Sequence, residues 1–305
     1  MTPPPSGQQV TLRSADQELT VVEVGGGLRS YRWGDRDVLD GYAIDEVAPG
    51  AHGQALLPWP NRLEDGSYAF AGEQHQTPLS EPERRNAIHG LTRWRNWVVR
   101  VAEPARAELA MLVHPEPGYP FTLSVRLQYQ LGPDGLTVTL VATNEGHGPL
   151  PFGAGFHPYL SPGGPTVDPA RLRVPAATAL EVSERMLPTG RRHPVRGEED
   201  FRRPRTIGVQ VIDGCLTDLE RDGDGRAHVE LEGPDGRTVT LWLDQRWQLV
   251  QLFSGDTLSP ALRRRGLAVE PMTCPANAFR SGEGLLRLGP GETFSGSWGL
   301  SLRRA

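Results

Sequence analysis

The chain has 305 residues, of which 37% are hydrophobic and 23% are charged, as is typical of a protein with a buried hydrophobic core. Its formal net charge of −5 disfavours a binding surface for nucleic acid or for an anionic membrane. No apolar run approaches the roughly 20 residues that span a membrane. The sequence contains no lysine, which excludes Schiff-base enzymes, pyridoxal-phosphate enzymes and P-loop nucleotide binders, because each of these needs one.

The first residues, MTPPPSGQQV, have neither a basic start nor an apolar stretch, so we do not expect a secretory signal. We expect residues 1–9 to form a disordered lead and residues 10–305 to form one domain. The two cysteines, Cys215 and Cys274, are expected to stay reduced. Together these features favour a cytoplasmic protein.

Short segments of alternating apolar and polar residues recur along the chain, with turn residues between them. Strands are predicted within residues 17–41 (two or three of them), at 123–131, from 135 onward, at 227–233, at 237–244 and at 291–304. The turn Pro234-Asp235-Gly236 predicts a hairpin. Residues 161–206 are rich in proline, arginine and glycine, and we interpret them as a loop-heavy excursion with strand character near 174–186. This pattern predicts an all-β, antiparallel sandwich.

The stretch FGAGFHPYL, residues 152–160, places a histidine among small and aromatic residues. If the stretch is extended, its side chains alternate between two faces. The phenylalanines and the alanine would fill the core on one face, and the other face would carry Gly153, Gly155, His157 and Tyr159. Because glycine projects no side chain, we expect a hollow that His157 faces. The alternative is a buried structural histidine that takes part in no chemistry.

The stretch GLAVEPMTCPANAF, residues 266–279, places Glu270 among apolar residues. Burial would raise the pKa of such a glutamate toward the value that a general base needs at neutral pH. The alternative is an edge-strand glutamate that points to water. His157 and Glu270 each precede a proline, and a residue before proline is restricted to extended backbone.

Further polar residues interrupt the remaining segments. His89 precedes Gly90, and Asn61-Arg62 follows a segment with two prolines, which predicts an extended loop or an edge strand. Arg62 could present its donors to ligand oxygens, or it could be an ordinary surface arginine. Asp213 precedes a glycine, as turn aspartates commonly do.

Local motifs for metals and cofactors are missing from the sequence. HExxH, CxxC, GxSxG and a strand-borne GxGxxG do not occur. We therefore expect neither a metal nor a cofactor, although a metal site assembled from distant residues stays open.

Six segments together resemble the aldose 1-epimerase (mutarotase) family, and in particular its less characterised bacterial members. They are PWPNRLEDGSYAFAG, NAIHGLTRWRNW, FGAGFHPYL, LPTG, VIDGCLTDL and AVEPMTCPANAFRSGEGLLRLGPGE, which spread from about residue 56 to residue 298. The resemblance implies a large antiparallel β-sandwich of the galactose mutarotase type, a supersandwich, with a sugar site on a concave face.

The resemblance also implies roles for individual residues. His157 would be the general acid and Glu270 the general base, so the chemistry would need a protonated histidine beside an ionised glutamate. The sugar would be bound by the positions Asn61, Arg62, His89 and Asp213. Candidates for stacking on the sugar are the aromatic residues Trp59, Tyr159 and Trp247.

The implied activity is the cofactor-independent interconversion of the anomers of a free aldose, with a monosaccharide as the partner. One alternative is a hexose-6-phosphate epimerase, whose phosphate could be met by arginines among Arg93, Arg95, Arg191 and Arg192. Others are a non-catalytic sugar-binding protein and a metal-dependent β-sandwich enzyme. The sequence leaves the preferred aldose open, and also the choice between monomer and dimer.

Overall fold

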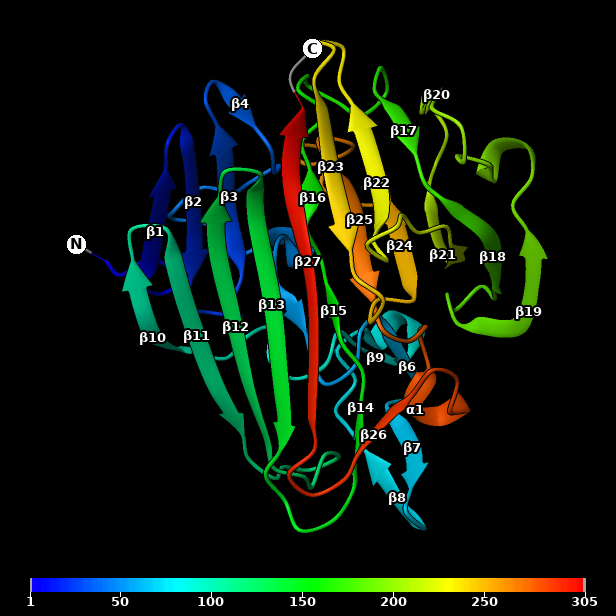
Figure 1. Cartoon of the computed structure of the whole chain (residues 1–305). Coiled ribbons are helices and arrows are strands. Elements are labelled where there is room, and N and C mark those ends of the chain that lie inside the picture. The colour runs from blue at the N-terminus through cyan, green and yellow to red at the C-terminus, as the bar shows by residue number, and fades with distance from the viewer. Residues whose placement is uncertain (1, 304–305) are drawn as a thin grey trace.

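The computed structural model describes residues 2–303, and in this range nearly all regular structure is β-strand. Two large antiparallel sheets face each other (Figure 1). Because both sheets bury one face, the chain is an all-β sandwich, as predicted. No helix among the described residues is long and apolar enough to cross a membrane.

The larger sheet has nine strands in the order β10-β11-β12-β13-β27-β23-β22-β17-β20. Its bounds are β10 (Val98–Glu103), β11 (Arg106–Val113), β12 (Leu123–Gly132), β13 (Gly135–Asn144), β27 (Thr293–Arg303), β23 (Thr238–Leu243), β22 (Ala227–Glu232), β17 (Arg171–Arg173) and β20 (Arg205–Thr206). Its long central strands alternate buried and less buried residues, so one face meets the core.

The second sheet has eight strands, in the order β19-β18-β21-β24-β25-β15-β5, with β16 also paired to β25. Its bounds are β19 (Pro188–Pro194), β18 (Ala176–Val182), β21 (Asp213–Leu219), β24 (Leu249–Phe253), β25 (Leu267–Met272), β15 (Gly155–Phe156), β16 (Tyr159–Leu160) and β5 (Ala55–Leu56). Strand β25 lies inside this sheet and is buried along its whole length.

Smaller elements complete the fold. A four-stranded sheet is formed by β1 (Gln9–Ser14), β2 (Gln17–Val22), β3 (Leu28–Trp33) and β4 (Arg36–Asp37). Two-stranded pairs are β6 (Arg62–Glu64) with β9 (Asn86–Ile88), β7 (Ser67–Phe70) with β8 (Glu73–Gln76), and β14 (Leu150–Phe152) with β26 (Leu286–Leu288). The short helices are α1 (Ala278–Ser281), η1 (Pro49–Ala51), η2 (Pro82–Arg84) and η3 (Gly197–Glu199).

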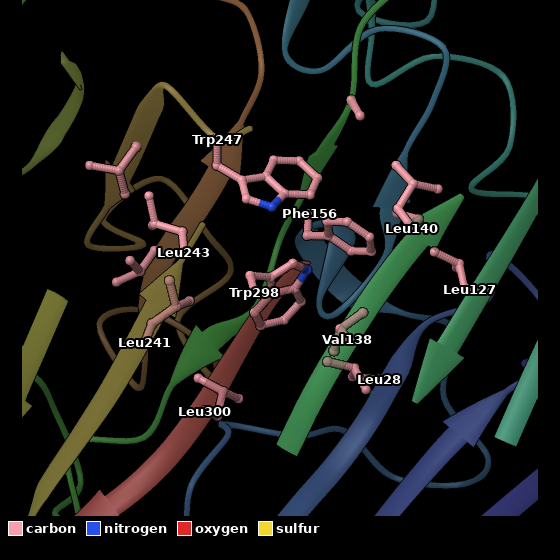
Figure 2. Close-up of a cluster of buried hydrophobic side chains, with 14 of the residues drawn as sticks. Leu28, Leu127, Val138, Leu140, Phe156, Leu241, Leu243, Trp247, Trp298 and Leu300 are labelled. Atoms are coloured by element: carbon pink, nitrogen blue, oxygen red, sulfur yellow. The ribbon is translucent and has the colours of Figure 1, made fainter. Parts of the chain in front are cut away.

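Aromatic side chains join the two large sheets across the core (Figure 2). Phe156 of β15 lies 5.2 Å from Trp298 of β27 and 5.6 Å from Trp247, measured between ring centroids. All three rings are almost fully buried, and rings of this size contribute several kcal/mol each, about 3–5 when truncated to alanine. Since Phe156 is fixed in this core, the next residue along the strand must point to the other face of the sheet.

Most of the predicted strands are confirmed. The segments at 17–41, 123–131, 135 onward, 227–233 and 237–244 correspond to β2–β4, β12, β13, β22 and β23, and the last two pair as the expected hairpin. The final strand ends at Arg303, and Arg304 lies outside the described residues.

Two regions carry more regular contacts than the sequence suggested. In the expected lead, Ser6 is buried and its carbonyl accepts a hydrogen bond of 3.0 Å from the N–H of Val24, while Met1 lies outside the described residues. Within residues 161–206, the segment Pro188–Pro194 forms β19, where the sequence predicts a loop. Strand β19 is mostly exposed and is the edge of its sheet, so it lacks the apolar alternation that marks a strand.

Candidate active site

Strand pairing brings His157 and Glu270 together. His157 lies in the short gap between β15 and β16, and both of these strands pair with β25 in one register. Continued across the gap, that register sets His157 opposite Glu270 of β25. The distance between His157 Nε2 and Glu270 Oε1 is 3.3 Å. The glutamate is therefore an interior residue of a central strand, and the alternative of an edge-strand side chain in water is wrong.

Alternation along the strands turns these groups away from the core. Phe156 and Val269 belong to the hydrophobic core, so their neighbours His157 and Glu270 point to the opposite face of the sheet. On the adjacent strand β24, Gln251 pairs with Glu270 and points to the same face. A row of polar side chains thus crosses three neighbouring strands.

The hollow expected beside His157 is filled, although the predicted division into two faces is confirmed. A side chain at Gly155 would bring its Cβ within 2.7 Å of Pro60, and one at Gly153 would come within 2.5 Å of the Cys274 sulfur. These two glycines therefore allow close packing of the loop that carries Pro60. The open space that His157 faces comes from neighbouring segments instead.

That space is a cavity of about 420 Å³. All six site residues predicted from the sequence line it, namely Asn61, Arg62, His89, His157, Asp213 and Glu270. They come from segments far apart in the chain, and the paired strands bring them to one place. A cavity of this size is within the range of small-molecule sites.

The pair β6–β9 positions three of these residues. Arg62 pairs with Ile88, and the N–H of His89 donates to the carbonyl of Asn61 at 2.8 Å. Asn61 and His89 both have left-handed backbone, with φ of 54° and 63°. Such strained conformations in non-glycine residues cluster at functional sites. The following Gly90 is required, because a Cβ there would lie 2.0 Å from the carbonyl oxygen of Leu57.

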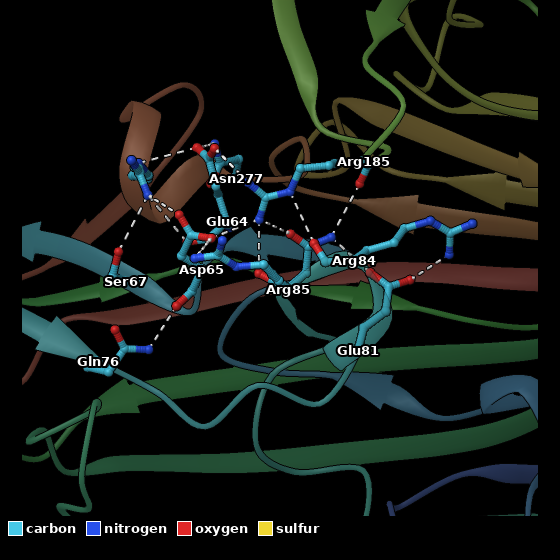
Figure 3. A network of polar contacts seen from close by, with 11 residues as sticks. Glu64, Asp65, Ser67, Gln76, Glu81, Arg84, Arg85, Arg185 and Asn277 are labelled. Atoms are coloured by element: carbon cyan, nitrogen blue, oxygen red, sulfur yellow. Dashed lines mark hydrogen bonds and ion pairs between the residues drawn. The ribbon is translucent and has the colours of Figure 1, made fainter.

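A network of charged groups holds Arg62 in place. Its guanidinium donates to both carboxylate oxygens of Glu81, at 2.9 to 3.1 Å. Glu81 also accepts from the side-chain amide of Asn86 at 2.9 Å, and that amide is bonded to Arg185. Figure 3 shows how Arg185 bridges the loops around Glu64, Asp65 and Arg85. These contacts fix the guanidinium of Arg62 as a hydrogen-bond donor at the edge of the cavity.

Gln251 also lies at the site, although it is not among the residues predicted from the sequence. Its side-chain N–H donates to Asp213 Oδ1 at 2.8 Å, and both residues line the cavity. The sequence does contain a sign of it, because the polar Gln251 interrupts the apolar strand LVQLF in the same way that Glu270 interrupts the apolar strand β25.

Burial dominates the electrostatics of the acid–base pair. It raises the pKa of Glu270 well above its ordinary value, and the negative charge of Asp213 adds to the rise. Burial lowers the pKa of His157 to about 3, and positive charge on His52 and Arg93 contributes to this fall. Burial also lowers the pKa of His89 well below its ordinary value. The unliganded pair therefore favours a neutral histidine beside a protonated glutamate, which differs from the expected ion pair.

The aromatic residues are placed differently from the expectation. Trp59 and Trp247 are buried in the hydrophobic core and do not line the cavity. Tyr159 does line it, but its ring is stacked between two histidines. The ring most open to a ligand is that of Trp94, which lines the cavity and is 53% exposed.

Three arginines line the cavity, but Arg62 and Arg84 are both paired with Glu81. Within residues 2–303, no group of three or more histidine, cysteine, aspartate or glutamate side chains could hold a metal ion. Of the four arginines considered for phosphate, Arg93 alone lines the cavity, and the others pair with acidic residues elsewhere.

The geometry defines an all-β protein with a histidine and a carboxyl group in contact at a cavity of about 420 Å³. Residues 8–301 match the aldose 1-epimerase family, so the chain belongs to that family. It is 35% identical to the uncharacterised protein YihR of Escherichia coli K12, over 94% of this chain and 91% of YihR. It is also 25% identical to human galactose mutarotase, over 69% of this chain and 64% of the mutarotase.

Solved structures show the same fold. The GalM/aldose epimerase homologue of C. elegans superposes with a TM-score of 0.86 at 17% identity, covering 98% of this chain and 99% of that chain. Galactose 1-epimerase of Lactobacillus acidophilus gives a TM-score of 0.82 at 20% identity, with 97% and 94% coverage. The predicted galactose mutarotase-type sandwich is confirmed.

Proposed function

We propose that the chain is a mutarotase that interconverts the α and β anomers of a free aldose without a cofactor, using His157 and Glu270. The observation that carries the proposal is their contact of 3.3 Å inside the cavity. Ring opening of a cyclic hemiacetal needs a base at the O1 hydroxyl and an acid at the ring oxygen O5. Since O1 and O5 are bonded to the same carbon, the base and the acid must lie close together.

The chemical step follows from these positions. Glu270 takes the proton of the O1 hydroxyl, the electrons of that O–H bond form the C1=O double bond, and the C1–O5 bond breaks. His157 donates its proton to O5. Rotation about C1–C2 presents the other face of the aldehyde. The ring then closes with the roles reversed, so that both residues return to their starting protonation.

One proton shared by the pair makes this possible. A neutral histidine beside a protonated glutamate carries the same number of protons as the charged pair that the reaction uses. Glu270 Oε2 has no hydrogen-bond partner among the described residues, so a sugar hydroxyl that donates to it stabilises the carboxylate. Transfer of the shared proton to His157 then needs no exchange with solvent.

Mutarotation of freshly dissolved α-D-glucose and α-D-galactose, followed by polarimetry, tests this proposal. Each positioned proton transfer is worth about 10²- to 10⁴-fold, so Glu270→Gln and His157→Ala should each lower turnover by that order. Glu83→Gln is the matched control, because Glu83 lines the same cavity but is exposed. Near-normal turnover in a folded Glu270 or His157 variant would remove that residue from its role. Sugar binding without acceleration by the wild type would indicate a binding protein.

A second candidate, an epimerase of phosphorylated aldoses, is favoured by Arg93. This guanidinium lies over the Trp94 ring, 4.7 Å from its centroid, and has no carboxylate partner among the described residues. Arg62 and Arg84 also line the cavity but are already paired with Glu81. Glu83 and Asp213 line it too and disfavour a dianion, so the free aldose stands first. D-glucose 6-phosphate should be turned over faster than D-glucose only if the second candidate holds, and Arg93→Gln should then abolish the preference.

A further inference from the structure

A column of three parallel rings leads away from His157. The imidazole of His157 is stacked on the ring of Tyr159, with centroids 4.9 Å apart and planes at 15°. Tyr159 is also stacked on the imidazole of His52, at 3.7 Å and 5°. The side chain of His52 is 2% exposed, and His52 is not among the residues that line the cavity. It can therefore act on the site only through its neighbours.

Polar contacts fix the far end of the column at both nitrogens of His52. Its Nε2 lies 3.3 Å from Asp40 Oδ2, and its Nδ1 contacts the carbonyl of Pro49. Both partners are acceptors, so both nitrogens are satisfied only when both carry protons. Arg265 holds the other Asp40 oxygen at 2.7 Å. Burial alone would raise the pKa of Asp40, but hydrogen bonds from His52 and Arg265 keep it below its ordinary value.

The middle ring is anchored as well. The hydroxyl of Tyr159 donates to the carbonyl of Gly50 at 2.9 Å, and the backbone N–H of Asp40 donates to the carbonyl of Tyr159 at 2.8 Å. Backbone hydrogen bonds also tie the segment after His52 to His157, because Gly53 donates to its carbonyl at 2.9 Å. The three rings therefore come from segments locked to one another.

His157 itself lacks the usual support of a catalytic histidine. Its Nδ1 has no hydrogen-bond partner among the described residues, whereas an imidazole is commonly oriented by an acceptor at the nitrogen that does no chemistry. Its ring meets His89 edge-on at 5.4 Å and Tyr159 face-on. The orientation of the His157 imidazole is therefore set mainly by its packing against the rings of His89 and Tyr159.

We propose that His52, fixed by Asp40, is a positioning residue that acts through Tyr159 to hold the His157 imidazole in the orientation from which Nε2 serves the ring oxygen. The inference rests on the proposed role of His157 as the acid. When both nitrogens of His52 carry protons for their two acceptors, its charge has a second effect, because it lowers the pKa of His157 and so makes the protonated form of His157 a stronger acid. The charged and titratable groups around the column are Asp40, Arg265, His157, His89, Arg93, Glu270 and Asp213.

Two substitutions separate the ring from the charge. His52→Ala removes both, and His52→Phe keeps a ring for Tyr159 to stack on. We expect His52→Ala to lower kcat by about 10- to 100-fold, the cost of a misplaced catalytic group, with KM nearly unchanged. His52→Phe should recover most of kcat. In both variants the limb of the pH–rate profile that belongs to His157 should move to higher pH, because the positive neighbour is gone.

The steady-state kinetics are measured on the full chain with the aldose that the wild type turns over fastest, and unfolding midpoints confirm that each variant is folded. A folded His52→Ala with wild-type kcat and an unmoved pH limb would overturn the inference. So would a His52→Phe that is as slow as His52→Ala. If the wild type accelerates no aldose, the proposed function fails, and NMR titration of the His157 ring in wild type and His52→Ala still decides on the column. An unchanged titration and unchanged ring shifts would overturn the inference in that case.

Discussion

Glu270→Gln should raise the free energy of unfolding of the protein, although the same substitution abolishes most of its activity. The wild-type carboxyl is buried, and the pKa of Glu270 is raised by burial first and by Asp213 second. Glutamine has nearly the same shape and no charge to lose. The gain in the free energy of unfolding should therefore depend on pH, and that dependence is the sharp part of the prediction.

The sign follows from counting protons. Below about pH 4.3, the ordinary value for glutamate, the carboxyl is protonated in both the folded and the unfolded chain and contributes no difference. As the pH rises above this value, the unfolded chain loses the proton while folded Glu270 keeps it. The free energy of unfolding of the wild type then falls by as much as about 1.4 kcal/mol per pH unit, until the carboxyl group of Glu270 ionises in the folded chain as well. The variant escapes this loss, so its advantage over the wild type grows over that interval and then levels off.

Urea unfolding at several pH values from 4.5 to 8 measures the difference between the two proteins. Glu83→Gln supplies the comparator for the loss of one exposed carboxylate at the same cavity. The quantity to compare is the difference in the free energy of unfolding between Glu270→Gln and Glu83→Gln, which should increase as the pH rises. A Glu270→Gln advantage that stays constant from pH 4.5 to 8 would refute the reasoning, since the folded carboxyl would then titrate as it does in the unfolded chain.

Three further outcomes are expected. Asp213→Asn removes a negative neighbour and should lower the pKa of Glu270, which would move the Glu270 limb of the pH–rate profile to lower pH. Gly155→Ala forces a Cβ to within 2.7 Å of Pro60 and should cost about 1–3 kcal/mol in urea unfolding; a neutral effect would mean that the Pro60 loop yields. Phe156→Ala should cost about 3–5 kcal/mol by the same measurement, and a loss below 1 kcal/mol would contradict its place between the sheets.

The strands that the sequence predicted share one property. Most of them have one face in the core and one outside, as β12 shows with its regular alternation of buried and less buried residues. Strand β19 lacks this property because it is an exposed edge, and β25 lacks it because it is buried throughout. The sequence still pointed to β25, because a single glutamate stood out in an apolar run. A contrast between buried and exposed positions made a strand easier to predict, although it was not sufficient, because the alternating strand β11 was not predicted.

The candidate site was predicted where a residue's chemistry contradicts its surroundings. Glu270 in an apolar strand is such a residue, and the same signal could have found Gln251. The errors concern packing partners that are distant in sequence. Nothing near Gly155 indicates that Pro60 will fill the space beside it, and nothing near Trp247 indicates that it will meet Phe156 in the core. These contacts are made by the tertiary fold, so local patterns could not show them.

The interruption at His157 explains how a sheet can present a reactive side chain without losing its register. Pro158 has no N–H to give to the ladder, so β15 ends before His157 and β16 begins after Pro158. The backbone of His157 is satisfied on the other side, since its N–H donates to Gln54 at 3.1 Å and its carbonyl accepts from Gly53 at 2.9 Å. The histidine is thus bonded to one neighbouring segment and released from β25, although it stays opposite Glu270. Its side chain can then meet the glutamate, while the pairing on both sides keeps the two within reach of each other.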